Sequence, residues 1–85
     1  MIEYSVYPGY SVEHYKKACK FVEDLLRDEI VNQKSLIDVD GSQLQFYNTS
    51  QGEILVINDF DYDWVIVQSE FEINNTEWYL RKQTP

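Results

Sequence analysis

The apolar residues between Val12 and Ile30 recur at every third or fourth position, which is the period of one face of an α-helix. They are Tyr15, Ala18, Cys19, Val22, Leu25, Leu26 and Ile30. Ser11 stands directly before this stretch and is a favourable N-cap, while Tyr10 and Tyr15 occupy the positions of a hydrophobic staple. The pattern therefore predicts one amphipathic helix from Ser11 to about Val31.

Elsewhere the apolar residues follow the period of two, or the short apolar runs, that are typical of β-strands. The expected strands are Ile2–Tyr7, Leu36–Asp40, Gln43–Tyr47, Glu53–Ile57, Trp64–Ile73 and Thr76–Lys82. Turn residues such as Asp40-Gly41 separate them, so consecutive strands after the helix should form an antiparallel meander. We predict a single domain over residues 1–85 with an α+β fold, in which a single amphipathic helix packs on an antiparallel β-sheet of about five or six strands, in the order β-α-β-β-β-β-β.

One helix covers only one face of such a sheet. Strict alternation places Val65, Val67, Phe71 and Ile73 toward the helix. It places Gln43, Gln45, Tyr47, Trp64, Ile66, Gln68, Glu70 and Glu72 on the open face. Large aromatic side chains on an otherwise polar and acidic surface are typical anchors of protein-binding sites, so Tyr47 and Trp64 are candidate contact residues.

The net charge of −8 is concentrated in the second part of the chain. Residues 1–35 contain six acids and five bases, whereas residues 35–80 contain nine acids and no Lys or Arg. A field of one sign repels nucleic acid and anionic lipid and attracts a basic protein surface. The alternative is that the acids only keep a small protein soluble.

The helix carries its charges in the order that its dipole disfavours. Lysines occupy the first half, and Glu23, Asp24, Asp28 and Glu29 the second half. Asp24 and Asp28 also form a like-charged i,i+4 pair. These acids are either held for a cationic partner or neutralised by Lys20 and Arg27.

A run of alternating acids and aromatics, Asn58 to Trp64, precedes the longest expected strand. In an extended backbone the carboxylates of Asp59, Asp61 and Asp63 point one way, and the rings of Phe60, Tyr62 and Trp64 the other. The acids match places one, three and five of an EF-hand loop, and Glu70 matches place twelve. Trp64 stands where that loop needs glycine, so we predict no specific calcium binding. We expect the carboxylates to meet a cationic partner or to remain solvated.

The same spacing, ~6.5–7 Å between extended acids, resembles the interphosphate rise of nucleic acid. Nucleic-acid mimicry is therefore an alternative function.

Few residues offer other chemistry. Cys19 is the single cysteine, which excludes an internal disulfide and fits a reducing compartment, the cytoplasm. We expect it to be an inert core thiol, and we expect His14, the single histidine, to lie at the surface or at the boundary of the core. We find no zinc set, nucleophile–base pair, phosphate loop, apolar membrane span or signal peptide. We therefore expect no enzyme activity, no metal and no cofactor.

These observations predict a small acidic protein that binds and masks a basic protein surface. The natural form of such a protein is an immunity protein or antitoxin that neutralises a nuclease toxin. The alternatives are a phage-type inhibitor that mimics nucleic acid and a structural module that forms homo-oligomers. We expect a basic protein partner, no direct nucleic acid or membrane contact, and a monomer or homodimer. The candidate partner-binding residues are Asp24, Asp28, Tyr47, Asp59, Asp61, Tyr62, Asp63, Trp64, Glu70 and Glu72.

Overall fold

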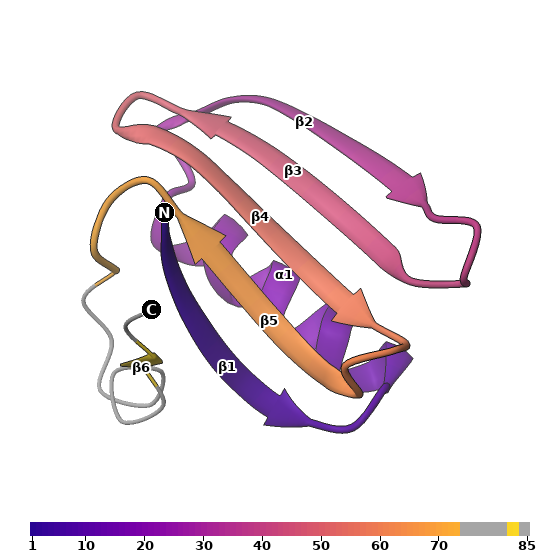
Figure 1. The fold of residues 1–85 in the computed structure, drawn as a ribbon. Coiled ribbons are helices and arrows are strands. Elements are labelled where there is room, and N and C mark those ends of the chain that lie inside the picture. Colours follow the sequence, from indigo (N-terminus) through magenta and orange to yellow (C-terminus); the bar gives the residue numbers. More distant parts are fainter. Residues whose placement is uncertain (74–81, 84–85) are drawn as a thin grey trace.

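The computed structural model describes residues 1–73 and 82–83 and contains one helix packed on an antiparallel sheet (Figure 1). In chain order the elements are β1 (Ile2–Pro8), α1 (Val12–Leu25), β2 (Ile30–Ile37), β3 (Gln43–Thr49), β4 (Gly52–Asp59), β5 (Trp64–Ser69) and β6 (Lys82–Gln83). The strand order in the sheet is β2-β3-β4-β5-β1-β6. The predicted α+β fold is confirmed.

The helix α1 ends at Leu25, about six residues earlier than the sequence pattern predicts. Leu26 is its C-cap, and the chain then turns directly into β2. Acids at a helix C-terminus oppose the helix dipole, and the β-branched pair Ile30-Val31 favours a strand. Pairing of Ile30 with Thr49 of β3 completes the change from helix to sheet.

With 14 residues, α1 is too short to cross a membrane, and it is the only helix in the described residues.

The meander is confirmed for β2 to β5, but β1 and not β6 lies next to β5. β5 ends at Ser69, so Phe71 and Ile73 lie beyond the strand, where Ile73 is buried in the core and Phe71 packs against it. The expected last strand, Thr76–Lys82, falls outside the described residues except for Lys82, which pairs with Tyr4 of β1.

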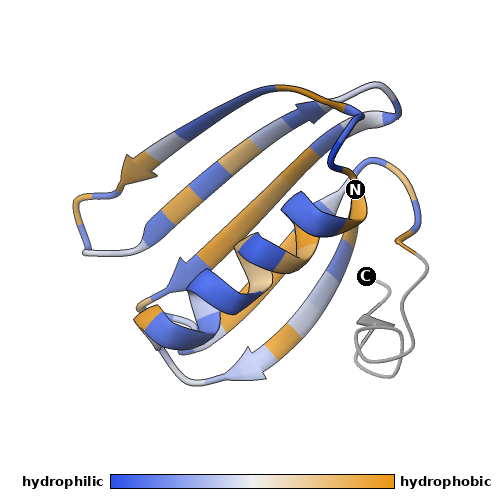
Figure 2. Cartoon of the chain, turned by 180° about the vertical axis from the view of Figure 1, so that it is seen from behind, coloured by the Kyte–Doolittle hydropathy of each residue, from blue (hydrophilic) through white to orange (hydrophobic). Residues whose placement is uncertain are grey.

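The core lies between α1 and the strands β4, β5 and β1 (Figure 2). Its fully buried side chains include Tyr4, Val22, Ile54, Val56, Val65 and Val67. Tyr47 belongs to the same core and is 0 % exposed, so its expected place on the open face is wrong. The reason is register: Tyr47 pairs with Ile54, and paired residues share a face of the sheet.

The expected positions of Gln43 and Gln45 are wrong for the same reason, since both share the face of Tyr47. Polar residues are accommodated on this face because α1 covers β4 and β5, while β2 and β3 extend past the helix (Figure 2).

The open face of the sheet instead carries apolar residues from four neighbouring strands. They are Leu36, Leu44, Phe46, Leu55, Ile57, Trp64 and Ile66. Trp64 and Ile66 therefore lie on the predicted face, but Trp64 is half-buried and Ile66 is only 4 % exposed.

Candidate protein-binding surface

Three loops meet at one end of the sheet, where β1, β2 and β4 end. We call residues 9–11, 38–42 and 59–63 together the loop end. The amide of Phe60 donates to Ser42 Oγ at 2.9 Å, and the Tyr10 hydroxyl donates to the Gly41 carbonyl at 3.1 Å. The amide of Gly9 donates to the Asp63 carbonyl at 2.8 Å. These contacts join the three loops into one surface.

The segment 60–63 is a tight turn and not the extended run that its alternation predicts. The Asp63 amide donates to the Asp59 carbonyl at 3.0 Å, and Asp63 has a φ of 61°. Such left-handed backbone is more accessible to Asp than to most residues. The three carboxylates of Asp59, Asp61 and Asp63 therefore do not stand in a straight row at strand spacing.

Two of these carboxylates also hold the backbone in place. Asp59 Oδ1 accepts from the Tyr62 amide at 2.9 Å, and Asp63 Oδ1 accepts from the Tyr10 amide at 2.8 Å. In the described residues, no group of three His, Cys, Asp or Glu side chains is placed to hold a metal ion. The acids of the turn thus serve the fold and still present negative charge at its surface.

Behind the loop end lies a buried amide that the sequence analysis did not single out. Asn58 is 0 % exposed; its Oδ1 accepts from the Ser11 amide at 3.0 Å, and its Nδ2 donates to Gln43 Oε1 at 2.9 Å. Ser11 in turn caps the helix, because its Oγ accepts from the His14 amide at 3.2 Å. The signal was present in the sequence, since Asn58 follows Ile54 and Val56 at strand spacing and must share their inward face.

The loop end exposes aromatic and aliphatic side chains. Phe60 is 56 % exposed, Tyr62 is 50 % exposed, and Val39 is fully exposed at the tip of the β2–β3 turn. The rings of Tyr10 and Phe60 meet edge to face, with centroids 5.3 Å apart. Of these, the sequence analysis selected only Tyr62, because the proximity of the turn at 38–42 depends on strand pairing.

The charge of the loop end is of one sign. It contains five aspartates and no Lys or Arg. They are Asp38, Asp40, Asp59, Asp61 and Asp63. Asp38 and Asp40 were not predicted as site residues. The sequence did contain a signal, because an apolar residue between two acids in a turn, as in Asp-Val-Asp-Gly, is exposed next to their charges. Carboxylates of one sign gathered on one surface produce a negative potential there.

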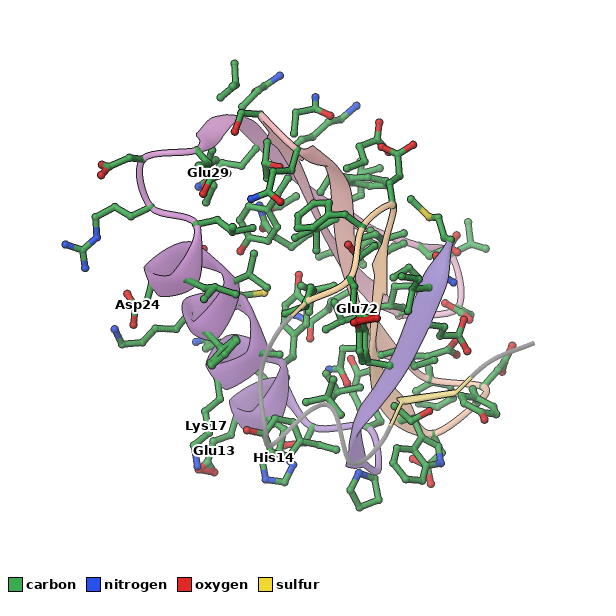
Figure 3. The ribbon with its side chains drawn as sticks, turned by 90° about the vertical axis from the view of Figure 1, so that its left-hand side faces the viewer. Glu13, His14, Lys17, Asp24, Glu29 and Glu72 are labelled. Carbon is green, nitrogen blue, oxygen red and sulfur yellow. The ribbon has the colours of Figure 1, made fainter. Side chains whose placement is uncertain are left out.

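The remaining predicted site residues lie elsewhere. Asp24 pairs with Lys20 at 3.0 Å and with Arg27 at 4.0 Å, so the neutralising interpretation holds for this carboxylate. Asp24 and Glu29 lie toward the end of α1 that is farther from Glu13 and His14 (Figure 3). Asp28 is exposed in the turn after α1. The structure therefore separates the helix acids from the loop end.

Glu70 and Glu72 follow β5 at the end opposite the loop end. Glu70 Oε1 accepts from the Glu53 amide at 2.7 Å, next to the turn between β3 and β4. Glu72 borders a hollow of about 220 Å³ that is also lined by Leu25, Glu29 and Phe71. Neither residue belongs to the same surface as Asp61.

Tyr47, inside the core, bonds to the helix. Its hydroxyl donates to Glu23 Oε2 at 2.6 Å, and burial together with this bond raises the pKa of Tyr47. Burial also raises the pKa of the Cys19 thiol to about 11, which keeps the thiol protonated at neutral pH. His14 stacks on the ring of Tyr7 at 4.5 Å and is half-buried. These groups are parts of the packing.

Comparison of the chain with protein-family models, curated proteins and solved structures gives no match.

Proposed function

We propose that this chain is a binding protein that masks a basic surface of another protein, in the manner of an immunity protein or antitoxin that neutralises a nuclease toxin. One observation carries the proposal: the loop end joins five aspartates to exposed aromatic side chains and contains no Lys or Arg. Acids around a binding site accelerate association with a basic partner, and aromatic anchors slow its dissociation. The proposed role requires no catalytic group, metal or cofactor.

Basic active-site surfaces are typical of nucleases, since they must bind the phosphates of nucleic acid. An acidic end that covers such a surface would exclude the substrate. The hydrogen bonds among the three loops favour this role, because a preorganised surface loses less entropy on binding. Mimicry of a nucleic-acid strand loses its support, since it rested on extended spacing of Asp59, Asp61 and Asp63.

The test is affinity capture from the native host at low and high salt, followed by a nuclease assay of the captured protein. We expect a basic nuclease that is retained at low salt, released at high salt, and inhibited at a one-to-one ratio. Exclusive capture of neutral or acidic proteins would overturn the proposal.

A matched pair of variants localises the surface. Asp61→Asn combined with Asp63→Asn removes two charges from the loop end, and the amide side chain introduced at position 63 retains an oxygen that accepts from the Tyr10 amide. Asp24→Asn combined with Asp28→Asn removes the same charge near the far end of α1. The first pair should slow association and flatten its salt dependence, while the second should have a much smaller effect. Equal effects of the two pairs would contradict the loop end as the binding surface.

A further inference from the structure

The strand β2 forms an outer edge of the sheet. It stands first in the strand order, and no element lies beside its outer edge in the described part of the chain (Figure 1). It has eight residues, and all of them from Val31 to Ile37 are exposed. It contains no proline and no acid, and Lys34 is its only charge. A long edge with unpaired backbone groups is a template for another strand, and of the features that block such pairing β2 has only Lys34 and an irregularity between Ile30 and Asn32.

Exposed apolar side chains are concentrated at this edge. Val39 is 102 % exposed, Val31 is 79 % and Ile37 is 76 %, and these are the three most exposed large hydrophobic residues that the structure describes. All three belong to β2 or to the turn that follows it. Burial of such side chains would favour an added strand.

The pattern of residues 33–39, which we call the edge segment, is complementary to itself. Suppose that two copies pair antiparallel, with the same face of each sheet on the same side and the two-fold axis at Leu36. Lys34 of each copy then lies opposite Asp38 of the other copy. The two Leu36 side chains then meet on the axis, and Ser35 lies opposite Ile37.

The register within the molecule supports this arrangement. Lys34 and Leu36 lie opposite Phe46 and Leu44, so both occupy the open face. The Asp38 amide donates to the Ser42 carbonyl at 2.8 Å, so the β2–β3 ladder continues one residue past Ile37, and the exposed Asp38 carboxylate accepts from the Val39 amide at 2.7 Å. The alternation of a strand assigns Asp38 to the same face as Lys34 and Leu36. By contrast, a two-fold axis at Lys34 would place the two Lys34 side chains opposite each other, which is unfavourable.

From this charge complementarity we infer that the edge segment pairs with the edge segment of a second copy of this chain, so that two sheets join into one across a two-fold axis. The inference does not rest on the proposed function, although the edge segment shares Asp38 and Val39 with the loop end. Edge pairing alone buries a small area, so the dimer is of the weak class, with a dissociation constant in the ~micromolar range or above.

Sedimentation equilibrium of the wild-type chain tests the inference. The apparent mass should rise with concentration from 10.2 kDa toward twice that value. Position 34 faces Asp38 of the other copy twice in the dimer. Lys34→Asp therefore places two carboxylates opposite each other at both places and should raise the dissociation constant about tenfold or more. Asp38→Lys should act in the same direction, and the double variant Lys34→Asp with Asp38→Lys should restore dimerisation.

The control is Lys16→Asp, which changes the net charge equally at an exposed helix position and should leave the dimer intact. A second measurement uses Leu36→Cys in a Cys19→Ala background, which should form an intermolecular disulfide under mild oxidation, whereas Gln33→Cys in that background should not. A wild-type chain that stays monomeric at millimolar concentration overturns the inference. So does a dimer that Lys34→Asp and the double variant leave unchanged, because it would use another surface.

Discussion

Asn58 connects two parts of the fold that are far apart in the sequence. Its side chain bonds to the helix N-cap residue Ser11 on one side and to Gln43 of β3 on the other. A buried amide with both groups satisfied fixes a single arrangement, whereas an unsatisfied one is costly. Asn58 therefore fixes the helix start against the sheet together with Asp63, which accepts from the amides of Gly9 and Tyr10.

We expect Asn58→Ala to lower the free energy of unfolding by about 2–3 kcal/mol, because it leaves the Ser11 amide and the Gln43 side chain without their buried partner. Urea denaturation measures this change. Asn48→Ala, at an exposed position of the neighbouring strand, is the control and should change stability by less than about 0.5 kcal/mol. A similar small loss for both variants would show that the buried amide contributes little.

Cys19 provides a prediction on pH. Burial raises its pKa from 9.0 to about 11, so the thiolate fraction at pH 8 falls about a hundredfold. We expect slow reaction with a thiol reagent at pH 8 and full reactivity in denaturant. Because the folded pKa is the higher one, the stability that the neutral thiol contributes is complete below pH 9.0 and is lost as the pH rises through about 11. Equal labelling rates for the folded and the denatured chain would contradict the burial.

At the scale of elements, α1 is held by its cap and its packing more than by its charges. Ser11 Oγ accepts from the His14 amide, whereas the Lys20–Asp24 pair is largely exposed and contributes little. The acids that follow the helix instead explain why it ends at Leu25, since Asp28 and Glu29 disfavour further turns.

Ser11→Ala should lower stability by about 1 kcal/mol, because it removes the side-chain acceptor at the N-cap. Ser11→Asp should retain or improve stability, since aspartate caps as well and its charge suits the helix N-terminus. The melting temperatures of both variants, compared with that of the wild-type chain, test this expectation. Destabilisation by both would mean that the site is limited by space and not by the cap.

For the molecule as a whole, the aromatic residues at and next to the loop end differ in how far they are packed. Tyr62 and Phe60 are at least half exposed, whereas Trp64 is half-buried on the open face. Residues that lie on a surface without being packed are free to serve as anchors. Trp64, expected as an exposed anchor, has a share in the packing as well.

We therefore expect Tyr62→Ala to leave the melting temperature nearly unchanged but to speed dissociation of the captured partner, at a cost of ~2–4 kcal/mol in binding. Trp64→Ala should lower the melting temperature. Both quantities are measured on each variant. A Tyr62→Ala variant with unchanged dissociation would remove Tyr62 from the binding surface.

Calcium should cause no saturable change in Trp fluorescence below millimolar concentration. The carboxylates of Asp59 and Asp63 already accept backbone amides, and the loop lacks the glycine that an EF-hand requires. A micromolar transition that Asp61→Asn abolishes would show that the turn rearranges to bind the ion.

The sequence by itself determined the elements whose pattern is local. The stripe from Tyr15 to Leu26 predicts the helix, and the turn at Asp40-Gly41 with the strands around it predicts the meander, because period and turn chemistry depend on near neighbours. The acidity of the region after Ser35 was equally plain.

Only the tertiary structure decided which residues lie on the same face of the sheet and which loops meet at the same end of it. Pairing with Ile54 turns Tyr47 into the core, because a sheet's side-chain period of two makes faces depend on exact register. The loop end arises because β1, β2 and β4 finish on the same side, which brings Ser42 to Phe60 and Gly9 to Asp63. Such contacts between distant segments follow from the packing of the whole chain, and no local pattern encodes them.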